Sequence, residues 1–394
     1  MCKFVLVFFS LLTYDIQMQE SARAAFAGKR GTVLKKLSVC ILFGGVSPEH
    51  EVSLRSAESV LNNLNPEKYN IFPVGITRDG QWILFGGSDY SMLPNGTWES
   101  CPRNRRAALS PVRGQGLLSF ENDCVVRERI DVVFPVLHGE NGEDGSMQGL
   151  LQIAGIAYVG SGVGASSACM DKSMTKLIAQ NAGILQARWQ VIRAHEWARD
   201  QNGCMDAAER AFSYPVFVKP AGTGSSVGIS KAKSREELEL SVADALRYGK
   251  KVLVEEFIDG QEIEVAVLGN ENPCASVCGE IEAGAEFYDY EAKYLSDSAR
   301  FYVPARISEE LSEQVRETAV KVYTAMECRG LARVDFFVRR ADSAVVFNEI
   351  NTIPGFTSIS MYPKLFAASG IAYPALLDNL ISLAMEDEPW YRQQ

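Results

Sequence analysis

The segment FNEINTIPGFTS, residues 347–358, presents a carboxylate, an amide and a Pro-Gly pair within a few positions. Apolar residues precede it, which predicts a buried strand that runs into a loop. Charged side chains are rarely buried without a partner. A strand that ends in Glu349 and Asn351 therefore requires a neighbouring strand that explains both polar residues.

The preceding segment ARVDFFVRR, residues 332–340, is the predicted neighbour. A tight turn over residues 341–343 would join the two strands as an antiparallel hairpin, with Arg340 opposite Ala344. Counting back from that turn places Asp335 opposite Glu349.

The same register places Arg333 opposite Asn351, and all four polar side chains share one surface because side chains alternate faces along a strand. Directly opposed carboxylates destabilise a sheet unless a positive group lies between them or one is protonated. Arg333 supplies part of that charge. Two carboxylates and an amide oxygen are hard ligands suited to Mg²⁺, which also holds water and substrate phosphates. The alternative is a solvated strand face with an ordinary arginine–carboxylate pair.

The composition is that of a globular chain long enough for two or three domains, with 394 residues, 47% hydrophobic and 22% charged. The net charge of −10 provides no basic field for nucleic acid or an anionic membrane. Nine cysteines without a CxxC pair, with only three histidines, argue against a disulfide framework or a zinc site. They favour a reducing, cytoplasmic location.

The N-terminal residues include KFVLVFFSLL, residues 3–12, which is similar to the apolar region of a signal sequence. That run is too short to span a bilayer, and a polar stretch separates it from Ala25-Phe26-Ala27, which resembles a cleavage site. We therefore expect residues 1–36 to be a disordered extension, or to result from a start codon assigned too early.

Strands and helices alternate in the next part of the chain. The apolar run LSVCILFGG (residues 37–45) predicts a buried parallel strand, and Ser47-Pro48 predicts the N-cap and first residue of a helix. DVVFPVLHG (131–139) predicts another strand, followed by the helical SMQGLLQIA (146–154). This alternation predicts an open α/β sheet of the doubly wound kind.

Two further segments suit a nucleotide. VFVKPAGTGSSVG (residues 216–228) ends a strand at Lys219 and continues into a loop whose backbone amides can surround a phosphate. It is not a P-loop, because its lysine precedes the glycines, and ordinary turn chemistry is the alternative. VLVEEFIDGQEIEVAVL (252–268) carries Glu255 and Glu262, which can accept hydrogen bonds from a base and a ribose. Lys172 begins a predicted helix, where a surface lysine is the default.

Taken together, these segments resemble the D-alanine–D-alanine ligases of the ATP-grasp superfamily over residues 37–384. The matching segments, in family order and spacing, are LFGGVSPEHEVSLRSA, VLHGENGEDGSMQG, MDKSMTK, VKPAGTGSSVG, VEEFIDGQEIEVAVL, EFYDYEAKYL, RVDFFV and NEINTIPGFTSISMYPKL. The resemblance implies an α/β, three-domain ATP-grasp fold and a homodimer. Its domains would be a Rossmann-like substrate domain at 37–160, a central lid domain at 161–255, and a catalytic domain with an omega-type lid loop at 256–394.

The resemblance also implies a reaction. ATP, with Mg²⁺ or Mn²⁺ as two ions, phosphorylates the carboxylate of one D-alanine. The amine of a second D-alanine then attacks the acyl phosphate, which gives D-alanyl-D-alanine for peptidoglycan synthesis. Such phosphoryl transfer depends mainly on positioning and on neutralisation of charge.

Position by position, the resemblance assigns roles to residues of this chain. The metal ligands fall on Asp335, Glu349 and Asn351. The nucleotide contacts fall on Lys172, Lys219, Ser226, Glu255, the backbone of Ile258, and Glu262. Arg333 and the Gly355 amide would form an oxyanion hole.

The substrate contacts follow in the same way. Glu49 would bind the ammonium of the first D-alanine, with His138 beside its carboxylate. Ser225 and Tyr294 would link to Glu49 in a closed lid that excludes water. Lys293 and Ser360 match contacts near the second substrate. Thr223 receives no role.

Two alternatives stay open. The segment EAKYL favours D-alanine as second substrate, because lactate-adding relatives generally lack that Lys-Tyr pair, whereas a serine-adding activity differs by one hydroxyl and is harder to exclude. A nucleotide-binding module that has lost turnover belongs to another class. The combined presence of Arg333, Asp335, Glu349 and Asn351 argues against it.

Overall fold

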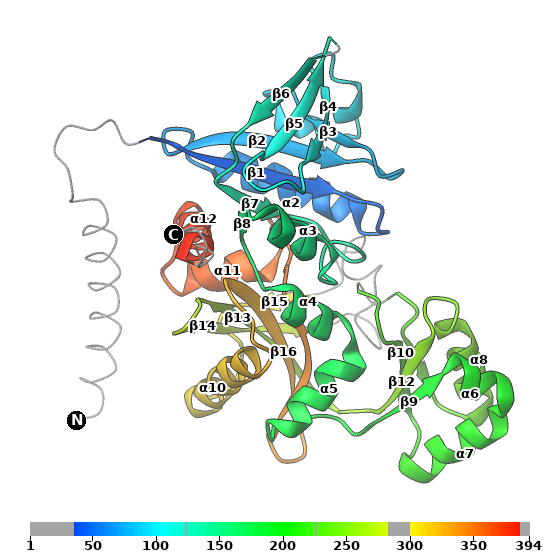
Figure 1. Ribbon diagram of the computed structural model, residues 1–394. Coiled ribbons are helices and arrows are strands. Elements are labelled where there is room, and N and C mark those ends of the chain that lie inside the picture. The colour runs from blue at the N-terminus through cyan, green and yellow to red at the C-terminus, as the bar shows by residue number, and fades with distance from the viewer. Residues whose placement is uncertain (1–34, 123, 225–226, 283–299, 387–394) are drawn as a thin grey trace, which may run out of the picture. The chain divides into compact units, whose positions relative to one another are not determined.

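The computed structural model describes residues 35–122, 124–224, 227–282 and 300–386. Residues 1–36 and 37–394 are separate units, and the account below concerns the second. The expectation for residues 1–36 falls outside the described residues except at Lys35 and Lys36. The second unit contains three sheets with helices packed against them (Figure 1).

The first sheet has eight strands in the order β6-β5-β4-β3-β2-β1-β7-β8. Its strands are β1 (Leu37–Gly44), β2 (Tyr69–Ile76), β3 (Trp82–Leu84), β4 (Arg105–Leu109), β5 (Leu117–Glu121), β6 (Cys124–Glu128), β7 (Val132–Pro135) and β8 (Ala157–Tyr158). Strand β1 pairs in parallel with β2 and β7, and β7 pairs in parallel with β8. The strands from β2 to β6 are antiparallel. The predicted parallel strand at residues 37–45 is thus confirmed, and half of this sheet is a meander that the sequence did not predict.

The helix after β1 begins later than predicted. Helix α2 spans His50–Asn63 with Glu49 as its N-cap residue, so Ser47-Pro48 does not start it. Instead, the Ser47 hydroxyl accepts a hydrogen bond from the Glu49 backbone N–H at 3.1 Å, which closes a short turn before the helix. Glu49 therefore lies at the N-cap of α2 rather than inside its first turn.

The other two sheets are antiparallel. The four-stranded sheet has the order β11-β10-β12-β9, and the five-stranded sheet has the order β15-β14-β13-β16-β17. Their strands are β9 (Trp189–Arg193), β10 (Val216–Pro220), β11 (Ser230–Ala232), β12 (Lys251–Glu256), β13 (Gly260–Leu268), β14 (Cys274–Glu282), β15 (Arg300–Tyr302), β16 (Leu331–Arg339) and β17 (Val345–Asn351).

The remaining helices cover these sheets. They are α3 (Ser146–Ala154), α4 (Val163–Met170), α5 (Lys172–Asn181), α6 (Ala194–Arg199), α7 (Gln201–Ala211), α8 (Arg235–Ala245), α10 (Glu309–Ala325), α11 (Met361–Ala368) and α12 (Tyr373–Glu386). The predicted helix at residues 146–154 matches α3, and α5 begins at Lys172 as predicted. Helix α8 is capped by Ser234, whose hydroxyl accepts a hydrogen bond from the Glu237 N–H.

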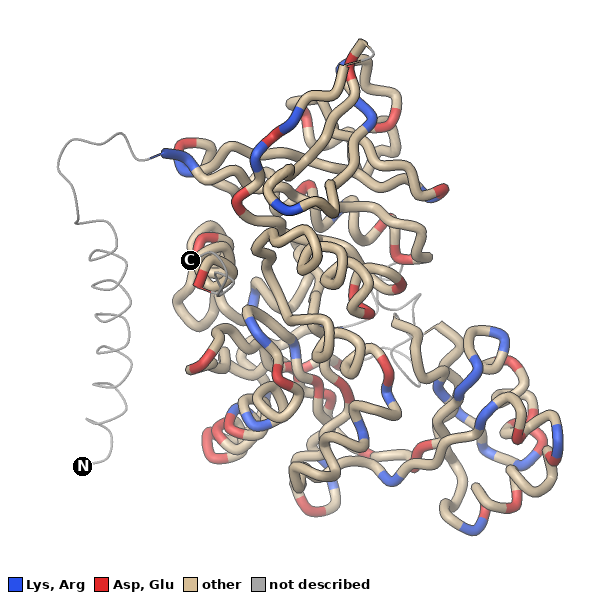
Figure 2. Tube along the Cα trace, viewed as in Figure 1, with Lys and Arg blue, Asp and Glu red and all other residues tan. Residues whose placement is uncertain are grey.

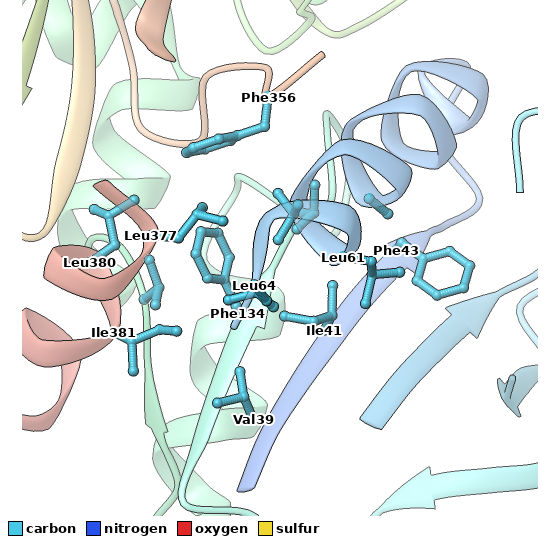
Figure 3. Packing of buried hydrophobic residues seen from close by; sticks show 14 of the residues in the cluster. Val39, Ile41, Phe43, Leu61, Leu64, Phe134, Phe356, Leu377, Leu380 and Ile381 are labelled. Atoms are coloured by element: carbon cyan, nitrogen blue, oxygen red, sulfur yellow. The ribbon is translucent and has the colours of Figure 1, made fainter. Parts of the chain in front are cut away.

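Phe356 joins the loop after β17 to the core around β1, β7 and α12 (Figure 3). The ring is fully buried; it lies edge-on to Phe134 at 5.7 Å between centroids and stacks on Tyr373 at 6.1 Å. Burial of such a ring contributes roughly 2 kcal/mol. The contacts of Phe356 with Phe134 and Tyr373 therefore anchor the loop that carries Gly355 and Ser360 to the core.

Charged side chains of both signs are interspersed along the described chain, without a block of one sign (Figure 2). In this part of the chain, no single helix is long and apolar enough to cross a membrane. Helices α11 and α12 reach the required length and apolarity only as a pair, and the chain bends by 104° between them.

Candidate active site

The predicted pairing of the last two strands is confirmed where it matters for the site. In the β16–β17 register Asp335 lies opposite Glu349, and Arg333 lies opposite Asn351. The predicted turn is wrong by one residue, because the Arg339 N–H, rather than that of Arg340, donates to the Ala344 carbonyl.

A β-bulge reconciles these two facts. The register shifts by one between Asp335 and Phe336, and Asn348 is the extra residue on β17. Buried apolar residues on β17 accordingly recur at Val345 and Phe347 and then, three positions on, at Ile350. The bulge compensates for the displaced turn, so the polar residues meet as expected.

A third carboxylate extends this row onto β13. Glu264 lies opposite Asp335 in the β13–β16 register, so acidic residues from three adjacent strands are in line. Arg333 neutralises two of them. Its Nε and one terminal nitrogen lie 2.8 and 2.7 Å from the two oxygens of Asp335, and its Nε lies 3.1 Å from Glu264 Oε1.

The charge on this arginine is strongly favoured. Burial alone would lower the pKa of Arg333, but the carboxylates of Asp335 and Glu264 raise it well above its ordinary value. The side chains of Asp335 and Glu264 are almost fully buried. A buried charge of this kind persists only when it is paired with hydrogen-bonded geometry, which the bidentate contact provides.

The donor set fits a magnesium ion that also holds phosphate. Among the described residues, no group of three or more His, Cys, Asp or Glu side chains converges as a closed metal site. Mg²⁺ does not need one, since one or two carboxylates with water and phosphate suffice. Glu349, whose side chain is 33% exposed, faces Asp335 in register, and Asn351 adds an amide oxygen.

Two lysines approach the carboxylate row from different elements. Lys172, the first residue of α5, donates from Nζ to the Thr223 carbonyl at 2.7 Å and lies 3.8 Å from Glu349 Oε2. Lys219, on β10, donates to Asn348 Oδ1 at 3.2 Å. Asn348, the extra residue of the bulge, therefore connects β17, which carries Glu349, to β10, which carries Lys219.

Glu255 lies between two lysines in the interior. Its Oε2 is 2.7 Å from Lys219 Nζ, and its Oε1 is 3.2 Å from Lys176 Nζ. Burial alone would raise the pKa of the Glu255 carboxyl, but the charges of Lys176 and then Lys219 lower it to about 2. Glu255 is thus a buried, ionised acceptor in the lining of the cavity.

The cavity lining also contains Glu49 and His138, both buried. Burial lowers the pKa of His138, an effect partly offset by the charge of Glu49. The neighbouring Glu143 accepts the Gly139 N–H at 2.7 Å, and burial, followed by the Glu49 charge, raises its pKa well above the ordinary value. This part of the cavity therefore combines the Glu49 carboxylate, which can bind a cation, with the neutral imidazole of His138.

Two glycines allow the chain to pass against Glu49. Gly139 has a φ of +69°, and a Cβ at this position would lie 2.6 Å from Glu49 Oε2. A Cβ at Gly224 would lie 2.9 Å from the same oxygen. The glycine-rich loop after β10 therefore reaches Glu49.

Three backbone amides of the loop after β17 donate hydrogen bonds within the protein. The N–H groups of Ile353, Phe356 and Thr357 donate to Asn351 Oδ1, Ser56 Oγ and Ser360 Oγ respectively. They stabilise the loop instead of facing a ligand. Gly355, whose amide was expected to contact the reacting group, does border the cavity.

Most of the predicted site residues border a single cavity. These are Glu49, His138, Lys172, Lys219, Glu255, Arg333, Glu349, Asn351, Gly355 and Ser360. Ile258, Glu262 and Asp335 do not border it, although Asp335 is held directly behind it by Arg333. Ser225, Ser226, Lys293 and Tyr294 lie outside the described residues.

Four further residues with a charged or amide side chain border the cavity: Glu143, Lys176, Glu264 and Asn348. Lys176 follows Lys172 by one helical turn, a spacing visible in the sequence. Glu264 lies two positions after Glu262, so it shares a strand face with that residue and could have been predicted. Its pairing with Asp335 could not. Asn348 required the bulge.

Comparisons with known proteins agree with this architecture. Residues 38–161 match the family described as D-ala D-ala ligase N-terminus, and residues 178–382 match D-ala D-ala ligase C-terminus. A D-alanine--D-alanine ligase of Acetivibrio thermocellus is 49% identical over 363 residues, which covers 89% of this chain and 96% of the relative. That of Caldicellulosiruptor bescii is 49% identical over 354 residues, covering 90% and 96%.

Two solved structures show the same arrangement of elements. The VanG D-Ala:D-Ser ligase from Enterococcus faecalis has a TM-score of 0.81 at 38% identity and covers 89% of this chain and 100% of that one. The D-alanine-D-alanine ligase from Coxiella burnetii has a TM-score of 0.77 at 34% identity, covering 91% and 96%. The fold is accordingly that of the ATP-grasp ligases. Within that class, the chain belongs to the D-alanine–D-alanine ligase family.

Proposed function

We propose that this protein is an ATP-dependent ligase that joins two D-alanines into D-alanyl-D-alanine for peptidoglycan synthesis. The observation that carries the proposal is the row of carboxylates on β13, β16 and β17, of which Glu264 and Glu349 border one cavity together with lysines from α5 and β10. Relatives with 49% identity over most of the chain carry that activity in their names.

The chain's own residues would act first on the nucleotide. Lys172 and Lys219 belong to different elements and both border the cavity, so they would neutralise phosphate charge from two sides. Glu255 would accept a hydrogen bond from the amino group of the base. Ser226, Ile258 and Glu262 are proposed as further nucleotide contacts.

Asp335, Glu349 and Asn351 would hold Mg²⁺, or Mn²⁺, as two ions. When bound, the metal supplies positive charge that polarises the phosphoryl oxygens. Arg333, fixed by Asp335 and Glu264, would contact the negative charge that develops on the reacting group, together with the Gly355 amide.

The end of the cavity at Glu49 would bind the first D-alanine. Its ammonium would pair with the Glu49 carboxylate, with His138 beside its carboxylate. Ser225 and Tyr294 are proposed to link with Glu49 in a closed lid, and Lys293 and Ser360 to contact the second D-alanine. Exclusion of water is essential here because an acyl phosphate hydrolyses readily.

We also propose that the protein acts in the cytoplasm as a homodimer on small-molecule substrates, without nucleic acid or membrane partners. The domain division at 37–160, 161–255 and 256–394 is supported by the three separate sheets.

A second candidate is ligation of D-serine in place of the second D-alanine. The similarity to a D-Ala:D-Ser ligase, at a TM-score of 0.81 and 38% identity, favours it. A pocket rejects an added hydroxyl only by roughly 10²-fold. Non-catalytic nucleotide binding is less well supported, since the complete carboxylate row and Arg333 are present.

The test is a product assay by mass spectrometry with ATP, Mg²⁺ and D-alanine, in competition with equimolar D-serine and D-lactate. D-alanyl-D-alanine with stoichiometric phosphate is the expected product. A predominance of D-alanyl-D-serine would favour the second candidate, and nucleotide binding without any dipeptide would favour the non-catalytic one.

The Gly139→Ala variant tests the substrate end of the cavity. The added methyl group would lie 2.5 Å from Ser47 Oγ and 2.6 Å from Glu49 Oε2, and the backbone φ of +69° is strained for alanine. A displaced Glu49 should raise the KM for D-alanine by roughly 10- to 10²-fold, with the KM for ATP unchanged. The matched control is Gly149→Ala in α3, where a Cβ meets nothing within 4 Å. A normal KM for D-alanine in Gly139→Ala would remove Glu49 from the site.

A further inference from the structure

Lys176 is a buried cation to which the family resemblance assigns no role. Its side chain is 2% exposed and borders the cavity four residues after Lys172 on α5. Its Nζ has no hydrogen-bond partner with acceptable geometry among the described residues, although it lies 3.2 Å from Glu255 Oε1. A buried lysine with incomplete hydrogen bonding is costly unless its charge serves another group.

The pair joins two differently packed parts of the fold. Helix α5 packs, through Ala179, into the apolar cluster of the five-stranded sheet. Glu255 is on β12, whose Val252 and Val254 belong to the cluster of the four-stranded sheet. The Lys176–Glu255 contact therefore fixes the position of Glu255 relative to β16 and β17, which carry the carboxylates proposed to bind the metal.

Lys219 depends on the same carboxylate. An ammonium group has three donors. Lys219 uses one on Glu255 Oε2, at 2.7 Å, and one on Asn348 Oδ1, at 3.2 Å. One N–H therefore remains for a phosphate, and Lys176 shares the negative charge of Glu255. Without Lys176, the full charge of Glu255 would act on Lys219 alone.

We propose that Lys176 is a positioning residue of the nucleotide site, which holds Glu255 as an ionised, oriented acceptor for the base and leaves Lys219 a donor for phosphate. The proposal rests on the function proposed above in that it takes the ligand of the cavity to be ATP. The pKa of Glu255, lowered to about 2 by Lys176 and Lys219 against the effect of burial, is consistent with this role.

The experiment is a double-mutant cycle on binding of a non-hydrolysable ATP analogue, adenylyl imidodiphosphate with Mg²⁺, by calorimetry. Lys176→Met should weaken binding about tenfold, the effect of one hydrogen bond to a charged group. Glu255→Gln should weaken it at least as much. The double variant should bind as Glu255→Gln does, because Lys176 acts through Glu255.

A second measurement separates positioning from a general loss of structure. Lys176→Met should raise the KM for ATP and leave the KM for D-alanine within twofold of the wild type. Lys321→Met, which removes an exposed lysine on α10, is the matched control and should change neither. Equal losses for both substrates in Lys176→Met would overturn the proposal, as would analogue binding within twofold of the wild type.

If Lys176→Met does not fold, Glu255→Gln and the double variant still decide the question. The double variant replaces a buried charged pair by neutral groups, which proteins tolerate better than a single unpaired charge. Equal affinity of these two variants supports the proposal, and a further loss in the double variant overturns it. The binding assay needs no dipeptide product, so its result stands apart from the test of the ligase activity.

Discussion

Glu349→Gln is expected to abolish turnover while leaving the protein folded. The substitution keeps the shape of the side chain but removes the more exposed of the two carboxylates that face each other across β16 and β17. Loss of a group that merely supports a metal ligand costs up to about 10²-fold, so loss of the ligand itself should lower kcat/KM for Mg-ATP by at least about 10²-fold. Phosphate release with D-alanine measures it.

The melting temperature provides the second readout for this variant. Asp335 and Glu349 are like charges in direct opposition, which destabilises a sheet. Removing one should leave the melting temperature unchanged or slightly raised in the absence of metal. Glu317→Gln, on an exposed position of α10, is the control for the substitution. Phosphate release at the wild-type rate would refute the assignment of Glu349 to the metal.

Arg333→Met is expected to have the opposite signature, with loss of both stability and activity. The guanidinium binds Asp335 through two nitrogens and also contacts Glu264, and both carboxylates are almost fully buried. Removing one partner of a buried ion pair costs about 3–5 kcal/mol. If Arg333 donates to the reacting group as proposed, its loss should further lower kcat by roughly 10²- to 10³-fold.

Arg340→Met offers a matched control one residue beyond the same strand. Arg340 pairs with Asp259, and both side chains are more than half exposed, so its removal should cost no more than about 1 kcal/mol. Thermal unfolding followed by circular dichroism compares the two variants. If Arg333→Met has the melting temperature of the wild type, Arg333 is not needed to stabilise the buried carboxylates of Asp335 and Glu264.

Long periodic segments were predictable because one physical pattern determines them. The seventeen residues of α10 repeat their apolar side chains at helical spacing, and β1 is a continuous apolar run. The start of α2 was not predictable from Ser47-Pro48, since the serine hydroxyl closes a turn at Glu49 instead of capping the helix. In both arrangements, a helix cap or a turn before the helix, the serine hydroxyl accepts a hydrogen bond from a backbone N–H. Only tertiary packing selects between the two.

The site shows the same division. Counting residues across a hairpin placed Asp335 against Glu349, but it did so with a turn that is one residue off and a bulge that was not foreseen. The pairing of Glu264 with Asp335 joins strands far apart in the sequence, so no local pattern reveals it. Lys176 was accessible from helical spacing alone, and its partner Glu255 was not.

The extra residue on β17 has a consequence for how such a sheet acquires chemistry. Strict alternation over residues 348–351 would give two positions to the polar side, yet three of these residues, Asn348, Glu349 and Asn351, are polar and border the cavity. Phe347 and Ile350 remain in the apolar layer. A single extra residue can thus increase the number of polar side chains that a strand presents to a cavity while its hydrophobic face is preserved. A substitution in a regular strand of strict alternation cannot do this.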